Sequence, residues 1–180
     1  MIDAARYHAL ETLRDGRAVV IRAQRPDDRE GYRAAIARAS AETMYHRFFA
    51  AKHGFSDVEA HHFLDIDFVS QVALIAEVEE HGRPALIGSA RYIVTEPGVA
   101  EVSFSVIDEY QGMGIGGFLF AHLVRLGRSA GLREFVAEVL ADNAAMLRVF
   151  ERGGLAARER REGPVVHVAM TLPAEEGRSA

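Results

Sequence analysis

The feature of this chain that most constrains its fold is a glycine-rich run, YQGMGIGG, at Tyr110–Gly117. It follows a segment with strand-like alternation, Glu101–Ile107, and leads into a segment with helical periodicity, Ile115–Ala130. Glycine lets the backbone approach a ligand closely, and the free N–H groups at a helix start attract phosphate. The run therefore predicts either a strand–loop–helix unit that binds a pyrophosphate or a tight turn whose glycines serve packing alone.

Three of these glycines, Gly112, Gly114 and Gly117, also match the G-x-G-x-x-G pattern of dinucleotide-binding folds. The first strand of such a fold is buried on both faces and is continuously apolar. Here polar and apolar residues alternate over Glu101–Val106, and the pattern occurs late in the chain. Both features count against a dinucleotide-binding fold. A dinucleotide-dependent oxidoreductase that binds NAD(H) nevertheless remains the rival interpretation.

The remaining patterns predict an α/β chain with one domain over 1–180, a core at about 17–172 and a disordered tail at 173–180. The stretch RERR at 158–161 is expected to be a solvated turn, and a capping box at 56–59 predicts a short helix. Strands are expected at 18–23, 71–78, 85–94, 101–107, 134–140 and 165–172, and helices at 26–38, 40–49, 115–130 and 143–152.

Two absences narrow the chemistry. The 180 residues include no cysteine, which excludes a cysteine nucleophile, a disulfide framework and cysteine-ligated metal. Lys52 is the sole lysine, so there is no Gly-Lys-Ser/Thr loop of the kind that P-loop ATPases need. We expect no metal site, because His61, His62, Asp65 and Asp67 do not form a convergent set of three or four ligands.

Charge and hydropathy limit the partners. The formal net charge is −5, and clustered bases are what nucleic-acid binding requires, so no nucleic-acid partner is expected. No apolar run approaches the roughly 20 residues that span a bilayer, and the N-terminal residues lack a secretory core. We therefore expect no membrane association and a cytoplasmic location.

Residues 100–155 resemble the core of the GNAT N-acetyltransferase superfamily. The resemblance rests on three motifs in the family's order and spacing: QxxGxG at 111–116, VxxxN at 139–143 and LxxFxxxGL at 147–155. A looser similarity extends over about 17–172. Within the superfamily, SxExxYxRFF at 40–49 and AEVSF at 100–104 are similar to the catalytic domain of bacterial Pat-type protein lysine acetyltransferases.

The resemblance implies a GNAT fold: a single mixed, mostly antiparallel sheet of about six to seven strands, a central splayed parallel pair, and helices on both faces. It also implies acetyl-CoA as acyl donor, with the pantetheine arm in the gap between the splayed strands and the pyrophosphate on the glycine loop. Asn143 is expected either to touch the pantetheine or to cap a helix. The expected cofactor-binding residues are Phe104, Val106, Gln111, Gly112, Met113, Gly114, Ile115, Gly116, Gly117 and Asn143.

An amine must be neutral to attack a thioester, whereas a lysine ammonium has a pKa of about 10.4, so a general base is expected. Glu101 is the candidate, because protein-acetylating GNAT enzymes place a glutamate there; a solvated strand glutamate is the alternative. Glu138 is the reserve candidate. Many family members have a tyrosine where this chain has Phe150, so water or Tyr110 would protonate the departing thiolate.

The resulting hypothesis is an acetyl-CoA-dependent N-acetyltransferase that acts by direct attack in a ternary complex. Its acceptor is a primary amine, with a protein lysine favoured. The alternatives are a small-molecule amine acetyltransferase and, because of Phe150, a non-catalytic acyl-CoA-binding regulatory module.

Overall fold

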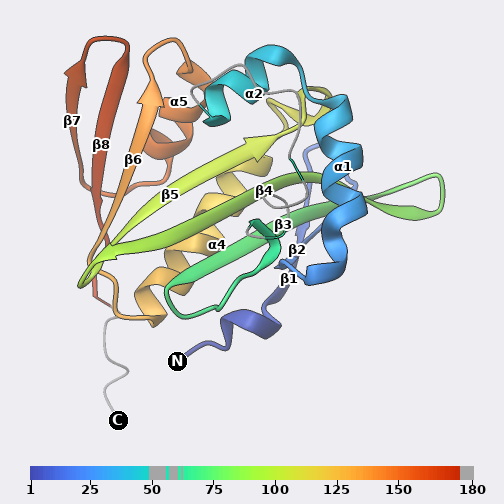
Figure 1. The fold of residues 1–180 in the computed structure, drawn as a ribbon, viewed down its shortest axis with the longest axis horizontal. Helices are drawn as coiled ribbons and strands as arrows, with labels where there is room; N and C mark the ends of the chain where they lie inside the picture. Colours follow the sequence, from blue (N-terminus) through green and yellow to red (C-terminus); the bar gives the residue numbers. More distant parts are fainter. Residues whose placement is uncertain (49–55, 57–60, 62, 175–180) are drawn as a thin grey trace.

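The computed structural model describes residues 1–48, 56, 61 and 63–174, which form one eight-stranded mixed sheet with helices on both faces (Figure 1). The strand order is β1-β2-β3-β4-β5-β6-β8-β7, and all neighbours are antiparallel except β5 and β6. The strands are β1 (His8–Thr12), β2 (Ala18–Ala23), β3 (Gln71–Glu80), β4 (Arg83–Glu96), β5 (Val99–Val106), β6 (Glu134–Leu140), β7 (Ala157–Glu162) and β8 (Val165–Thr171). The helices are η1 (Ala4–Arg6), η2 (Pro26–Asp28), α1 (Arg29–Arg38), α2 (Ala41–Phe48), η3 (Asp108–Tyr110), α4 (Ile115–Ser129) and α5 (Ala144–Arg152).

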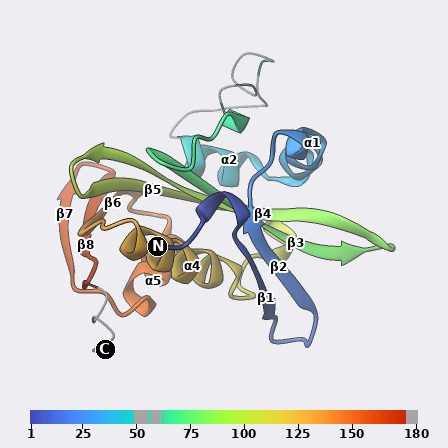
Figure 2. The ribbon, with the colours of Figure 1, turned by 90° about the horizontal axis from the view of Figure 1, so that it is seen from below.

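The helices lie in two layers. Figure 2 shows α1 and α2 on one side of the sheet and α4 and α5 on the other. The apolar stripe predicted on α4 is buried against the sheet, with Ile115, Leu119, Leu123 and Leu126 each at most 2% exposed. A helix of this kind is held by its apolar face more than by its intrinsic propensity.

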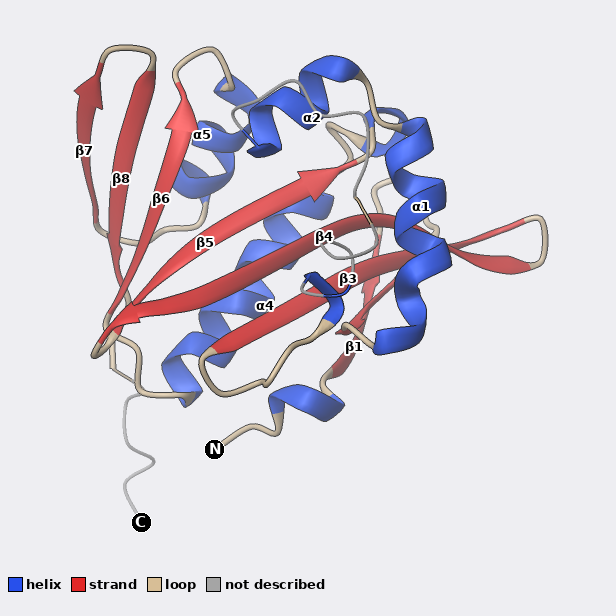
Figure 3. Cartoon of the chain, in the orientation of Figure 1, coloured by secondary structure: helices blue, strands red, loops and turns tan. Residues whose placement is uncertain are grey.

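The central parallel pair opens into a gap. Strands β5 and β6 pair only from Val99 to Glu101, which lie opposite Glu134 to Val136. Beyond those pairs the strands diverge, and Figure 3 shows them leaving a common end and separating. The edge of β5 that faces β6 is therefore unpaired from Val102 onward, which confirms the predicted splay.

The six predicted strands and the predicted helices at 26–38, 115–130 and 143–152 are confirmed to within a few residues, and the sheet has eight strands rather than six or seven. The prediction of a solvated turn at Arg158–Arg161 is wrong, because these residues belong to β7, which pairs with β8. All six β7 residues are exposed, so the strand carries no apolar alternation; charged edge strands of this kind discourage unwanted pairing. The missed strand β1 is likewise short and has no buried residue.

Two other expectations lie mostly or wholly outside the described residues: the short helix at 56–59 and the end of the tail at 175–180. None of the described helices combines the length and apolar character that crossing a membrane requires.

Candidate active site

The glycine loop runs from η3 into α4 through two left-handed residues. Gly112 has a φ of +75° and Gly114, the N-cap of α4, has a φ of +94°, where a side chain would be strained. No side chain caps this helix at Gly114, and a Cβ at Gly112, Gly114 or Gly117 would meet no atom within 4 Å. The start of α4 is therefore uncapped by a side chain, and the loop is uncrowded at three of its glycines, which suits an anionic ligand.

Other residues of the loop serve packing. A Cβ on Gly116 would lie 3.2 Å from Val149 of α5, so this glycine permits close contact between the two helices. Ile115 is 1% exposed and belongs to the core, and the Met113 sulfur lies 3.8 Å from Arg17 Nη2. Of the expected cofactor contacts in the loop, Gly112, Gly114 and Gly117 are thus the ones that packing leaves unexplained.

Gln111 ties the loop to α2. Its Nε2 donates to Thr43 Oγ1 at 2.9 Å and to the Val106 carbonyl at 3.0 Å. Nearby, the Asp108 carboxylate accepts from the Ser40 N–H at 2.8 Å and from Thr43 Oγ1 at 3.1 Å. Burial opposes ionisation of Asp108, but the hydrogen bonds from Ser40 and Thr43 prevail and hold its pKa below the ordinary value. These contacts fix the loop geometry before any ligand is present.

Tyr110, an expected candidate for the acid, is engaged elsewhere. Its ring is buried, and its hydroxyl donates to Glu80 Oε1 at 2.6 Å while accepting from Arg17 Nη1 at 3.1 Å. Burial and the bond to Glu80 raise its pKa. The hydroxyl therefore holds η3 against the β3–β4 hairpin and is poorly suited to delivering a proton to the gap.

Glu101 lies at the point where β5 and β6 begin to diverge. It is exposed, forms the last β5–β6 pair with Val136, and lies on the sheet face covered by α1 and α2 farther along. No hydrogen bond or ion pair to Glu101 is present among the described residues. The reserve candidate Glu138, on the same face of β6, lies 3.3 Å from His167 Nδ1. Glu101 is thus the carboxylate without a hydrogen-bonded partner among these residues, and its negative charge acts on the guanidinium of Arg47.

Asn143 caps α5, which is one of the two roles predicted for it. Its Oδ1 accepts from the Met146 N–H at 3.2 Å. Its amide nitrogen makes no hydrogen bond to any of the described residues, so the cap leaves one polar group for a ligand.

Phe150 belongs to an aromatic cluster below the gap. It is 2% exposed, and its ring centroid lies 5.3 Å from that of Phe120 and 5.9 Å from that of Phe104. The Phe104 side chain therefore packs away from the polar face, and only its backbone is placed for a cofactor. A phenylalanine in this cluster has no proton to give.

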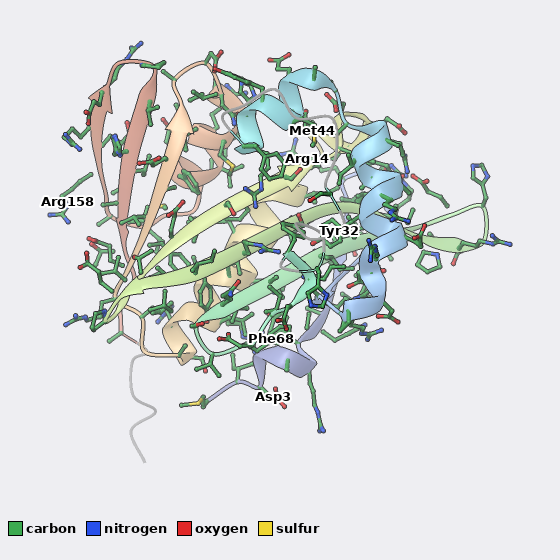
Figure 4. All side chains as sticks on the ribbon, in the orientation of Figure 1. Asp3, Arg14, Tyr32, Met44, Phe68 and Arg158 are labelled. Carbon is green, nitrogen blue, oxygen red and sulfur yellow. The ribbon has the colours of Figure 1, made fainter. Side chains whose placement is uncertain are left out.

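A cavity of about 40 Å³ lies between the sheet and the helices α1 and α2. Figure 4 labels two of the residues that line it, Tyr32 and Met44. Sequence reasoning missed its one charged lining residue, Arg47, and the neighbouring Arg91. The signal for Arg91 was a lone arginine within an apolar strand, ALIGSARYIV at 85–94. Arg47 belongs to the motif SxExxYxRFF at 40–49, but the motif alone assigned it no role in a cavity.

The described part of the chain contains no group of three or more histidine, aspartate or glutamate side chains placed to hold a metal. Asp67 instead orders a turn, because its carboxylate accepts from the N–H groups of Val69, Ser70 and Gln71.

The fold and the sequence have known relatives. "Acetyltransferase PA5475" of Pseudomonas aeruginosa is 36% identical over 140 residues, which are 77% of this chain and 75% of that protein. "Acetyltransferase Pat" of Mycolicibacterium smegmatis is 30% identical over 144 residues, which are 79% of this chain but only 42% of that longer protein. The crystal structure of the GNAT domain of S. lividans PAT is 33% identical, with a TM-score of 0.82 over 92% of this chain and 97% of that one. The model of the acetyltransferase (GNAT) family matches residues 39–155, and the chain therefore belongs to that family.

Proposed function

We propose that the protein transfers an acetyl group from acetyl-CoA to a primary amine, and that the acceptor is a lysine of a protein. The observation that carries the proposal is the arrangement along β5: an unpartnered carboxylate, Glu101, lies where the β5–β6 gap opens, and the glycine loop lies past the other end of the strand. The similarity of residues 40–49 and 100–104 to Pat-type enzymes, and the identity to Pat itself, favour a protein lysine.

The proposed acetyl-CoA site follows from backbone groups. The pyrophosphate accepts hydrogen bonds from N–H groups of the loop and of the first turn of α4, where the helix dipole also favours negative charge. The pantetheine arm pairs with the unpaired edge of β5 over Phe104–Val106, filling the place of a missing strand. The Asn143 amide, on the far side of the gap, donates to the same arm.

The proposed reaction is direct. Glu101 accepts a proton from the ammonium of the acceptor, either in contact or through a water molecule. The neutral nitrogen attacks the thioester carbonyl carbon, and a backbone N–H of the β5 edge stabilises the oxygen that gains charge. The nitrogen of the adduct then releases its extra proton to solvent, the C–S bond breaks, a neutral amide forms, and the thiolate leaves. The thiolate takes a proton from solvent, since Phe150 has none, and a thiol with a pKa near 8.5 leaves readily.

The first test is calorimetric titration with acetyl-CoA, with NADH as a parallel control. We expect saturable binding of acetyl-CoA and none of NADH, followed by release of CoA when a lysine-containing protein acceptor is added. A panel of small amines separates a protein acceptor from a small one. Binding of acetyl-CoA with no turnover on any acceptor would support a non-catalytic acyl-CoA-binding module, and binding of NADH alone would overturn the assignment.

A further inference from the structure

Arg47 is the charged side chain of the cavity beneath α2. It lies in the last turn of α2 and is partly buried, and every other described residue that lines the cavity is uncharged. Its guanidinium carbon lies 4.9 Å from the centroid of the Phe48 ring. Apart from such aromatic surface, the lining offers the hydroxyl groups of Tyr32, Ser89 and Ser105.

This arginine differs from Arg22 and Arg38, which are paired with carboxylates. Arg22 pairs with Asp28 and with Glu77, each at 2.6 Å, and Arg38 likewise pairs with two carboxylates. Arg47 has no hydrogen bond or ion pair with any residue that the structure describes. Buried polar groups in proteins are normally satisfied, and a guanidinium prefers a carboxylate that it can hold with two parallel bonds. The cavity therefore holds a donor without its acceptor.

A second cation reinforces the positive potential. Arg91 of β4 is 8% exposed, donates to the Phe63 carbonyl at 2.8 Å, and stacks 3.7 Å above the Phe63 ring, which lines the cavity. Among the described residues, every hydrogen-bond partner of Arg91 is uncharged. Burial and, secondarily, the charge of Arg91 lower the pKa of Arg47 to about 10, and burial lowers that of Arg91 as well. Both pKa shifts come mainly from burial, and the negative charge of Glu101 opposes the shift of Arg47; a bound anion would offset the cost of burying these cations.

We propose that this cavity binds a carboxylate carried by a substrate of the transferase, with the Arg47 guanidinium as its counter-ion. The inference rests on the acyl-CoA-dependent transfer to an amine proposed above, and it adds an acidic substrate either to the acyl donors or to the acceptors of that reaction. A cavity of about 40 Å³ exceeds the roughly 10–15 Å³ that one water needs, so it accommodates a group of carboxylate size. Arginine suits the task because its planar fork matches a carboxylate.

The position of the cavity allows two sources of the carboxylate. Ser105 lines it and lies between Phe104 and Val106, the backbone segment proposed to pair with pantetheine. A carboxylate could therefore be the far end of a dicarboxylic acyl chain, as in succinyl-CoA, or the carboxylate of an amino-acid acceptor. Both sources share the chemistry that Arg47 recognises, and matched pairs of ligands separate them.

The test compares each acid with a neutral analogue in the full chain. Calorimetry measures succinyl-CoA against butyryl-CoA, and leucine against leucinamide in the presence of CoA; kcat/KM is measured for the same pairs, with acetyl-CoA as donor for the second. We expect a preference for the acid of roughly tenfold or more in one pair, the scale of a charge-assisted hydrogen bond. The pair that shows the preference identifies the source.

Three variants assign the preference to Arg47. Arg47→Gln should abolish it, and Arg47→Lys should keep part of it because the charge remains without the fork. Arg83→Gln is the matched control, since it removes the same charge from the exposed tip of the β3–β4 hairpin (Figures 1 and 2) and Arg83 does not line the cavity. Thermal unfolding verifies that each variant is folded.

The outcomes are distinct. Binding of acetyl-CoA with no preference in either pair, or a preference that survives Arg47→Gln in a folded protein, overturns the inference and leaves the proposed function intact. Failure of the wild type to bind acetyl-CoA overturns the proposed function and the inference with it.

Discussion

Gln111 Nε2 donates to Thr43 Oγ1 at 2.9 Å, and this bond joins the glycine loop on one side of the β5 terminus to the first turn of α2 on the other. Because Gln111 also donates to the Val106 carbonyl, one side chain connects β5, the loop and the helix that covers the cavity. The glutamine of the QxxGxG motif is therefore a structural clamp that joins three elements of the fold.

The clamp can be measured by a double-mutant cycle. Gln111→Met and Thr43→Val should each lower the free energy of unfolding by about 1 kcal/mol per lost hydrogen bond. The combined variant should lose less than the sum, because both changes remove the same bond. Thr43→Ser keeps the hydroxyl and is the control. Strictly additive losses in denaturant unfolding would show that the two residues are not coupled.

The left-handed backbone of the loop gives a second prediction. Gly114→Ala places a side chain at φ +94°, where strain costs roughly 1–2 kcal/mol, and should shift the start of α4. We expect acetyl-CoA affinity to fall tenfold or more by calorimetry, because the N–H groups move away from the pyrophosphate. Gly131→Ala is the matched control, because Gly131 follows the other end of α4, has a φ of +80° and has equal space around it. This variant should lower the melting temperature yet keep the affinity for acetyl-CoA. Equal losses of affinity in both variants would argue against a ligand at the loop.

Local patterns carried most of the fold and part of the site. The strand β6 has the predicted bounds, and α4 buries the predicted stripe, because each element shows its own periodicity. The strands β1 and β7 lie at the two edges of the sheet, where burial imposes no apolar alternation, so the sequence lacked their signal.

The cavity depended on long-range register. Arg47 and Arg91 come from α2 and β4 and are 44 positions apart in the sequence, and only the packing of α2 over the sheet relates them. The role of Gln111 was similarly hidden: a motif shows that a glutamine is present, but its partner Thr43 is fixed by tertiary structure. Features that depend on local backbone conformation, such as the glycine loop and the Asn143 cap, were easier to predict from the sequence.

The proposed base gives a third prediction. Glu101→Gln removes the proton acceptor while keeping the shape of the side chain, so kcat should fall by roughly 10²-fold or more. Acetyl-CoA binding should persist, because the ligand is held by backbone groups elsewhere. Glu138→Gln is the comparison, since Glu138 lies beside His167. A larger loss in Glu138→Gln than in Glu101→Gln would transfer the role to Glu138.

A buried histidine behind the sheet gives the last prediction, on stability against pH. His122 is 7% exposed on α4; its Nδ1 lies 2.6 Å from the Tyr7 hydroxyl and its Nε2 lies 3.0 Å from Glu11 Oε1. Burial lowers its pKa despite the opposing effect of Glu11. The unfolded chain, with an ordinary histidine pKa near 6.5, therefore binds a proton that the folded chain rejects.

The sign follows directly. Above pH 6.5 both states are neutral at this site and the full stability is present. As the pH falls below 6.5, protonation favours the unfolded state, and stability declines by up to about 1.4 kcal/mol per pH unit until the folded pKa is reached. His122→Gln cannot titrate, so its unfolding free energy should fall less steeply between pH 6.5 and 5, a range above that in which the lowered carboxyl pKa values of Asp67, Asp108 and Glu80 act. Parallel pH profiles of the unfolding free energy in urea for the wild type and the variant would contradict this prediction. They would mean that His122 has the same pKa in the folded and the unfolded chain.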